Sequence, residues 1–445
     1  MKKIKNLPES DFLKLFFAFF TAAFLIGAVC MPDRAQMLSG FGRILTQTCK
    51  ISTNYFAVGG YAATFLNMGL VALICLGLYV LLGSTMNNVS TLAVILTTGF
   101  GSWGINMLNI WPTFLGVWLH CLIKKEKLKD NVNAMLFSTG IAPLISELMF
   151  RYPHAEAVGF TPGGFVLAMA VGIVIGMLVP AGLAHSPRVH KGFDLYSAAL
   201  PIGMTAFFLQ ATLFKTLGAA LPAAPAAETL QVASAAICNT FCCIVFGLCV
   251  VFAFALGCRP KDYWNLLTDP ALVTSFSGTY NTAVFLMNVG VFGLFILGYY
   301  NLIGATFNGV TFGVVFCMLA TCNSGSHPGN VWPIMLGYVA ASVVFAWLSP
   351  LVGGNFNGAI NAQAIVVGLC YANGLSPIAD KFGFRYGFLA AVMHYLLVTS
   401  VPTLHGGFCL YNGGFTAALI CLILMPSLEK LVPDKFQRLE RKNRA

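Results

Sequence analysis

The chain has 445 residues, of which 58% are hydrophobic and 9% are charged, against about 25% charged residues in a typical soluble domain. Residues 51–123 and 270–379 contain no Asp, Glu, Lys or Arg. Stretches of this length exclude solvated loops, and each can hold several membrane crossings of about 20 residues. The composition therefore predicts an all-α integral membrane protein, because backbone groups in lipid must be paired within their own segment.

The net charge of +10 does not indicate a nucleic-acid partner. The basic residues lie in short flanks of apolar segments, where Lys and Arg mark cytoplasmic loops. We therefore expect a multi-pass protein of the bacterial cytoplasmic (inner) membrane, with the lipid bilayer as a partner and both termini in the cytoplasm. The main basic flanks are residues 2–5, 124–129, 188–191 and the tail 430–445.

The 14 cysteines lie mostly inside apolar segments, and none has the paired spacing of a zinc site. Small buried hydrophobic residues are the better interpretation of these thiols. We expect no metal and no cofactor.

Apolar runs and breakers predict about fourteen hydrophobic segments, some of them discontinuous. We divide the chain into a first transmembrane repeat (1–214), an Ala/Pro-rich linker (215–228), a second transmembrane repeat (229–429) and a basic cytoplasmic tail (430–445). The segments of the first repeat are 12–31, 57–82, 88–107, 109–123, 133–150, 160–183 and 193–213. Those of the second are 231–257, 275–302, 305–325, 330–349, 362–379, 384–403 and 408–427.

The two halves share an internal repeat. Residues 67–116 and 288–337 align without a gap at an offset of 221 (288 − 67), and 18 of the 50 positions are identical. Two shorter blocks, at 140–144 and 190–196, recur in the same order at 374–378 and 405–411. A duplicated half in a very apolar chain is typical of transporters, whose substrate site lies where the repeats meet.

Charge favours an inverted orientation of the second repeat. An odd number of crossings per half, seven here, would insert the second copy upside down. The basic loop 124–129 corresponds to the uncharged loop 349–359, as expected if the second lies outside. Arg34, Arg43 and Lys50 oppose this arrangement unless their segment is an interfacial helix.

The first candidate site is a pair of polar breaks between apolar runs. Gly83, Thr85 and Asn87 recur as Gly304, Thr306 and Asn308. Gly together with Thr and Asn interrupts a helix and offers polar groups to a solute near the midplane. The alternative is a short turn in which each Asn caps the next helix.

The second candidate is the pair Asn109-x-Trp111-Pro112 and Asn330-x-Trp332-Pro333, for which framework is the favoured interpretation. The Gly-rich stretch before the second copy contains His327, which could bond a polar solute or carry a proton. Structural roles are more common for a lone histidine.

The third candidate joins His190 and Tyr196 with His405 and Tyr411, each pair beside glycines. Their recurrence suggests a polar lining on either side of a pseudo-symmetry axis. The alternative, which we weigh equally, is a helix-entry motif with His at the interface and Tyr in the aromatic belt.

No Asp or Glu stands in the centre of a predicted span, since Glu147, Asp194 and Asp380 lie near predicted ends. Carboxylates in mid-membrane usually mark proton or cation coupling. Their absence favours a neutral or zwitterionic solute, facilitated movement, or Na⁺ held by backbone oxygens. Nucleotide-binding and hydrolase motifs are also absent from the sequence, so we do not expect an enzyme.

The duplicated Asn-x-Gly, Gly-x-Thr-x-Asn and Asn-x-Trp-Pro blocks resemble those of an uncharacterised bacterial membrane family, domain of unknown function 1576. A fainter likeness, through Thr306-Phe307-Asn308-Gly309, is to urea transporters. We expect a permease, secondary transporter or channel that binds a small polar solute between the repeats. Whether the protein forms a homo-oligomer is left open by the sequence. The alternatives are a membrane-complex subunit or scaffold, and an intramembrane enzyme using His190, His327, Asp194 and Arg385 on a lipid-linked substrate.

Overall fold

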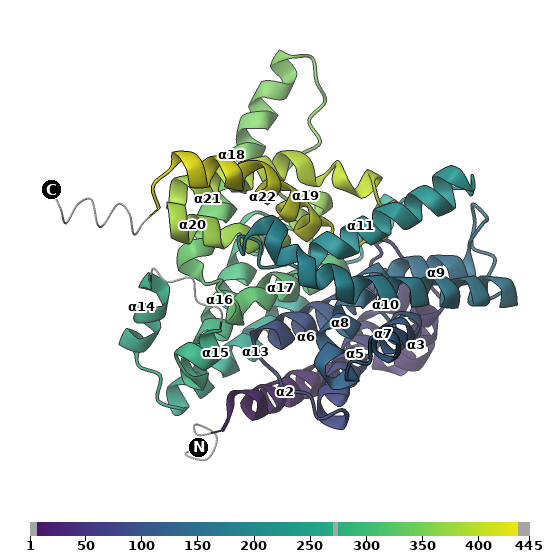
Figure 1. The fold of residues 1–445 in the computed structure, drawn as a ribbon, viewed down its shortest axis with the longest axis horizontal. Helices are drawn as coiled ribbons and strands as arrows, with labels where there is room; N and C mark the ends of the chain where they lie inside the picture. Colours follow the sequence, from purple (N-terminus) through teal and green to yellow (C-terminus); the bar gives the residue numbers. More distant parts are fainter. Residues whose placement is uncertain (1–6, 270–274, 435–445) are drawn as a thin grey trace.

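The computed structural model describes residues 7–269 and 275–434, and all regular structure in these ranges is helical (Figure 1). The all-α prediction is therefore confirmed. Eight helical stretches of this part are long and apolar enough to cross a membrane. They are α2 (Glu9–Cys30), α5 (Tyr61–Leu81), the broken stretch Leu128–Phe150, α10 (Pro162–His190), α13 (Ala235–Ala255), α16 (Thr282–Leu302), α18 (Pro328–Leu351) and α22 (Asn412–Leu431).

The other predicted apolar segments are also helical but shorter. Three are apolar helices of intermediate length, at Asn88–Phe100, Gly309–Asn323 and Phe384–Val398. Thus eight helical stretches of the described residues are long and apolar enough to span a membrane, whereas the sequence predicts about fourteen hydrophobic segments. The shorter helices are α6 (Asn88–Phe100), α7 (Trp111–Lys124), α11 (Ala199–Gln210) with the π-helical η4 (Ala211–Thr216), α17 (Gly309–Leu319) with η5 (Ala320–Asn323), α19 (Gln363–Ala372) with η6 (Asn373–Leu375) and α20 (Ser376–Phe382), and α21 (Phe384–Val398).

Short helices connect these elements. The stretch Leu128–Phe150 consists of η2 (Leu128–Asn131), α8 (Val132–Ser138), η3 (Thr139–Ile141) and α9 (Ala142–Phe150). The linker runs without helix from η4 to α12, and the predicted tail beyond residue 434 lies outside the described residues, as do residues 1–6. The remaining elements are η1 (Arg34–Gln36), α3 (Met37–Leu45), α4 (Tyr55–Gly59), α12 (Ala227–Leu230), α14 (Pro260–Thr268), α15 (Phe276–Thr279) and η7 (Val401–Thr403).

Polar caps start several of the long apolar helices. Thr161, Ser234 and Asn281 each accept a backbone amide from the first turn of α10, α13 and α16. Such residues satisfy amides that have no partner inside the helix. These caps therefore fix where each apolar run becomes helical.

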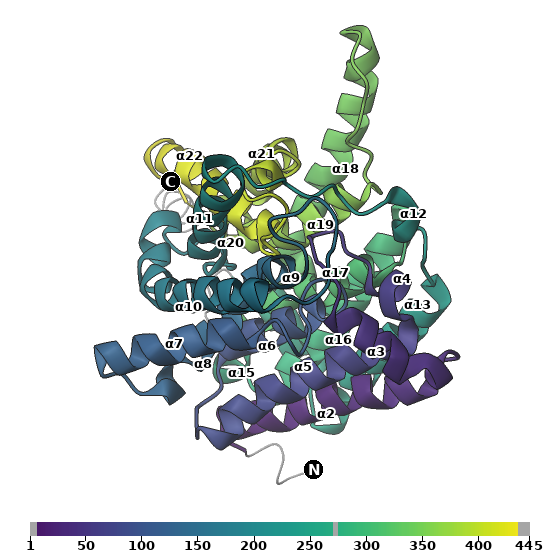
Figure 2. The same ribbon diagram turned by 90° about the vertical axis from the view of Figure 1, so that its right-hand side faces the viewer.

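The long helices pack in corresponding pairs. In the first half α2 lies against α5, and α7 against α10; in the second half α13 lies against α16, and α18 against α21. Figure 2 shows α2, α5, α7 and α10 in one layer, with α18 rising from the rest of the molecule. The two halves meet where α6 packs on α17 and α11 packs on α22.

Small residues allow α6 and α17 to approach closely. A Cβ atom on Gly313 would lie 2.2 Å from Ser102 Oγ and 2.4 Å from the carbonyl oxygen of Gly99. A Cβ atom on Gly99 would in turn lie 2.8 Å from Cys317 Sγ. Glycines at such contacts let helix backbones pack directly in membranes. The contact between the halves therefore depends on the absence of side chains here.

We predict that Gly313→Leu destabilises the protein by separating α6 from α17. Overpacking a well-packed interior typically costs about 1–3 kcal/mol, and a leucine against backbone should reach the upper end. Thermal unfolding of the purified protein measures the effect. The matched control is Gly298→Leu in α16, because a Cβ there meets nothing within 4 Å; equal melting temperatures for the two variants would contradict the prediction.

Candidate functional site

Asn87 and Asn308 cap the two helices that meet at the centre. Asn87 accepts the amide of Ser90 at the start of α6 (3.1 Å), and Asn308 accepts that of Thr311 at the start of α17 (2.9 Å). Asn87 is exposed, whereas Asn308 is buried and also donates to Gln363 Oε1 (2.7 Å). The structure thus gives both residues the capping role, and their binding of a solute stays a prediction.

The preceding glycines and threonines form turns. Gly83 and Gly304 have φ values of 65° and 69°, a left-handed conformation that ends α5 and α16 and favours glycine. Thr85 and Thr306 are exposed.

These two turns are not brought together. The amide of Met86 donates to Ser10 Oγ at the start of α2, whereas the side chain of Asn308 donates to the carbonyl of Leu230, shortly before α13. The start of α13 lies beside the end of α2, since Ile237 and Met31 line one groove. The start of α17 also lies at the far end of α6, where Gly309 contacts Ser102, so the two turns are separated by about 20 Å, the length of the 13-residue helix α6.

The histidines of the third candidate orient the backbone. His405 Nε2 bonds Asn412 Oδ1 (2.9 Å), and its Nδ1 accepts the amide of Cys409 (3.3 Å). His190 repeats this arrangement with Ser197 Oγ (2.8 Å) and the amide of Asp194. Burial lowers the pKa of His405 to about 4, so this ring is neutral near pH 7.

The tyrosines of this candidate lie between the halves. The amide of Leu195 donates to Gly374 O (3.0 Å), and that of Leu410 donates to Gly140 O (2.9 Å). Tyr196 packs on Gly374 and Tyr411 on Gly140, so each half places a tyrosine on a glycine of the other. Both tyrosines are fully buried, and they contribute to a closed interface in this conformation.

His327 caps α18. Its Nδ1 accepts the amide of Gly329 (3.1 Å), and its own amide donates to Asn330 Oδ1 (3.0 Å). This capping box gives the histidine a structural role, and its action as a solute ligand or proton carrier stays a prediction.

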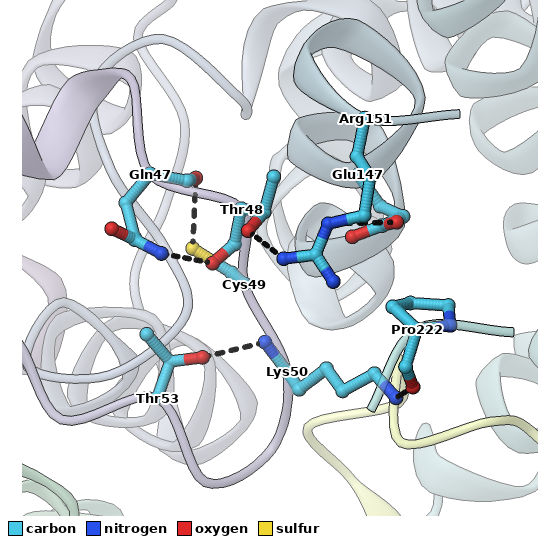
Figure 3. A network of polar contacts seen from close by, with 8 residues as sticks. All are labelled: Gln47, Thr48, Cys49, Lys50, Thr53, Glu147, Arg151 and Pro222. Carbon is cyan, nitrogen blue, oxygen red and sulfur yellow. Dashed lines mark hydrogen bonds and ion pairs between the residues drawn. The ribbon is translucent and has the colours of Figure 1, made fainter. Parts of the chain in front are cut away.

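A polar cavity of about 540 Å³ opens beside the end of α9. We call it the Glu147 cavity. Its walls are the segment from Gln47 to Val58, the end of α9 with the residues that follow, and the linker before α13. Three elements that are distant in the sequence therefore enclose one space (Figure 3).

Charged side chains of both signs line this cavity. Arg151 Nε lies 3.5 Å from Glu147 Oε1, and the guanidinium also bonds Thr48 Oγ1. Lys50 extends to the carbonyl oxygen of Pro222 in the linker, as Figure 3 shows. Burial lowers the pKa of Lys50, because desolvation disfavours its ammonium form; Glu147 acts in the opposite sense, and Arg151 lowers this pKa further.

Glu147 is the most unusual of these groups. It is 1% exposed, and neither carboxylate oxygen accepts a hydrogen bond within the described part of the chain. An ionised carboxylate that is removed from water without donors is costly, so such a group is a candidate for binding a ligand.

Sequence reasoning missed the Glu147 cavity. The sequence predicts Glu147 near the end of a span without a role, and Arg151 is not among the predicted site residues. The available signal was their spacing, since residues four apart lie on one face of a helix. A Glu and an Arg four residues apart at the end of an apolar run are therefore a signal in the sequence for a candidate site.

A smaller cavity, of about 290 Å³, lies at the start of α18. We call it the Asp380 cavity. Asn330 donates to Asp380 Oδ2 (2.6 Å) on its wall. The Asn-x-Trp-Pro pair, interpreted above as framework, thus contributes Asn330 to a cavity. The corresponding Asn109 donates to Ser146 Oγ (3.0 Å), next to Glu147.

Fold and composition together define a multi-pass helical membrane protein with polar cavities. The chain belongs to the family described as "Protein of unknown function (DUF1576)", whose model matches residues 33–215 and 259–430. The resemblance to this family is thereby confirmed. No curated protein and no solved structure matched the chain.

We predict that Arg151→Leu strongly destabilises the protein, because it leaves the buried Glu147 carboxylate without its cation. Removing one partner of a buried pair costs about 3–5 kcal/mol. The melting temperature of the purified protein measures this effect, and Arg188→Leu at an exposed arginine is the control. The double variant Arg151→Leu/Glu147→Leu should recover most of the loss; similar melting temperatures for Arg151→Leu and Arg188→Leu would show that the pair is not coupled.

Proposed function

We propose that this protein is a permease for a small polar solute, neutral or zwitterionic, which passes between the Glu147 cavity and the Asp380 cavity. The observation that carries the proposal is the relation of these cavities to the repeat. Asn109 and Asn330, at the offset of 221, donate to Ser146 beside the first cavity and to Asp380 in the second. Transporters built from two repeats commonly bind their substrate where the repeats meet.

Matched hydrogen bonds support the view that the halves are copies of one unit. Asn67 donates to the carbonyls of Gly101 and Ile105, and Asn288 donates to those of Cys322 and Ser326. Donors and acceptors are all related by the same offset of 221 (288 − 67, 322 − 101, 326 − 105). Helices α5 and α16 also begin and end at this offset.

The cavities lie at opposite ends of α13, which supports an inverted arrangement. The linker that walls the Glu147 cavity precedes the start of α13, whereas Asp269 in the Asp380 cavity follows its end by fourteen residues (269 − 255). The basic loop after α7 lies at the Asp380 end, because Lys129 O accepts from Ser84 Oγ in the turn beside Ser10. By the positive-inside rule, the Asp380 cavity then faces the cytoplasm.

The centre between the cavities is closed by packed side chains, which favours a mechanism with alternating access. Tyr196 OH donates to Cys317 O (2.8 Å) and Asn373 Oδ1 (2.8 Å), and the ring of Tyr196 contacts that of Tyr371 at 5.0 Å between centroids. Because these residues come from both halves, movement of one half against the other would open the path from one side at a time.

The proposed orientation predicts opposite accessibility for the two cavities. A cysteine at Ala224, exposed on the wall of the Glu147 cavity, should react with a membrane-impermeant maleimide added outside intact cells. A cysteine at Thr268, exposed on the Asp380 cavity, should react only after the membrane is opened. The background replaces the exposed Cys30 and Cys243 by alanine. Labelling of both positions from one side would refute the inverted arrangement.

Transport itself can be tested in proteoliposomes with a panel of labelled small polar solutes. We predict that at least one solute is accumulated or equilibrated, and that maleimide on Ala224→Cys lowers its uptake at least tenfold by filling the Glu147 cavity. The same label on a cysteine at the exposed position Gly42, which has nothing within 4 Å, should leave uptake unchanged. Uptake that survives complete labelling of the Ala224 position would reject this cavity as part of the path.

A further inference from the structure

We propose that the Glu147 cavity binds a zwitterion that carries an ammonium and a carboxylate, as an amino acid does, with the ammonium on Glu147 and the carboxylate on Arg151 and Lys50. This inference names a substrate class and rests on the proposed function. Its basis is the presence of opposite charges on the walls of one cavity (Figure 3).

The carboxylate of Glu147 is built to receive a donor. Its two oxygens have no hydrogen bond within the described residues, and the Arg151 guanidinium touches only one of them, at 3.5 Å. A buried acceptor left without a donor is costly, whereas a primary ammonium supplies three donors and a positive charge. An ammonium in the cavity would satisfy Glu147 better than Arg151 does.

The two cations of the cavity complement a carboxylate. The Arg151 side chain is 18% exposed and is held by Thr48, while Lys50 is held by the linker through Pro222. An arginine fork matches the geometry of a carboxylate. A bound anion would also favour the ammonium form of Lys50, whose pKa burial lowers.

The combination of charges excludes ligands with a single charge. A simple anion would leave Glu147 unpaired and add repulsion, whereas a simple cation would meet Lys50 and Arg151. Glu156, exposed at the rim, brings the cavity to two positive and two negative groups. A solute that is neutral overall but carries both charges therefore fits best.

Size is consistent with a small zwitterion. A volume of about 540 Å³ lies within the range of small-molecule sites. The apolar part of the wall consists of small residues, including Ala57, Ala155 and Ala223. These leave room for the side chain of an amino acid of moderate size.

The test compares each zwitterion with analogues that lack one charge. Thermal shifts of the purified full-length protein are measured with amino acids, and each active one is compared with its desamino acid and its decarboxylated amine, for example alanine, propionate and ethylamine. A ligand of the native state raises the melting temperature. We expect at least one amino acid to bind at least tenfold more tightly than either analogue, and equal shifts by propionate or ethylamine would overturn the inference.

Variants test the assignment of the two charges. Glu147→Gln should weaken zwitterion binding at least tenfold while the desamino acid binds as well as before or better. Glu156→Gln removes the same charge at the exposed rim and should keep zwitterion binding within about twofold. If Glu147→Gln does not fold, the analogue series on the unmodified protein still decides the question; zwitterion binding that is unchanged in a folded Glu147→Gln protein would overturn the assignment.

Uptake in proteoliposomes separates this inference from the proposed function. Uptake of an amino acid that its analogues do not inhibit supports both. Uptake of an uncharged solute that amino acids do not compete for would overturn the zwitterion and leave the permease standing. Binding of an amino acid without uptake of any solute would support the site and count against the permease.

Discussion

The interior of this protein depends on satisfying backbone carbonyls where α6 and α17 end. Gly101 and Ile105 follow α6, and their carbonyls lie among fully buried apolar groups such as Trp103. Water is scarce in such surroundings, so an unpaired carbonyl would be costly. One amide side chain, Asn67 of α5, donates to both, and the chain can therefore leave the helix inside the protein rather than at its surface. Once it has turned, Asn109 reaches Ser146 and fixes the helix that carries Glu147.

This constraint also explains why the two halves interlock. Helix α9 starts after a 3₁₀ turn at Thr139–Ile141, whose carbonyl at Gly140 accepts an amide from Leu410 of the other half. In the opposite sense, the amide of Leu195 in the first half donates to the carbonyl of Gly374 in the second half. Each half thus completes the backbone pairing of its partner, so neither is complete as a separate domain. Any movement of one half against the other must preserve these backbone pairs or replace them with other partners, because an unpaired buried amide or carbonyl is costly.

Most of the framework was accessible from sequence, and the site was not. The repeat and the capping alternative for Asn87 and Asn308 rest on local signals: identity at a fixed offset, and amide groups before apolar runs. The Glu147 cavity depends on packing between segments that are 100 residues apart, Lys50 and Arg151 among them (151 − 50 is 101). The position of Glu147 near the end of an apolar run predicts that it lies close to water, but the segment from Gln47 to Val58 and the linker cover this end. Burial of that kind is a tertiary property, which a one-dimensional hydropathy argument does not contain.

The two cavities differ in charge, and that difference bears on how a solute would move between them. By the offset that relates Pro143 to Pro377 (234), Glu147 corresponds to Lys381, whose ammonium lies over the ring of Phe193 at 5.1 Å. The Asp380 cavity has Asp269 and Asp380 on its wall and no Lys or Arg among its lining residues in the described chain. A zwitterion would therefore meet partners for both of its charges in one cavity and for its ammonium alone in the other. A ligand shifts a conformational equilibrium only by its difference in affinity between the states. Such a solute would favour the state in which the Glu147 cavity is occupied. The difference in charge between the two cavities would therefore make the solute bind more tightly in the Glu147 cavity than in the Asp380 cavity.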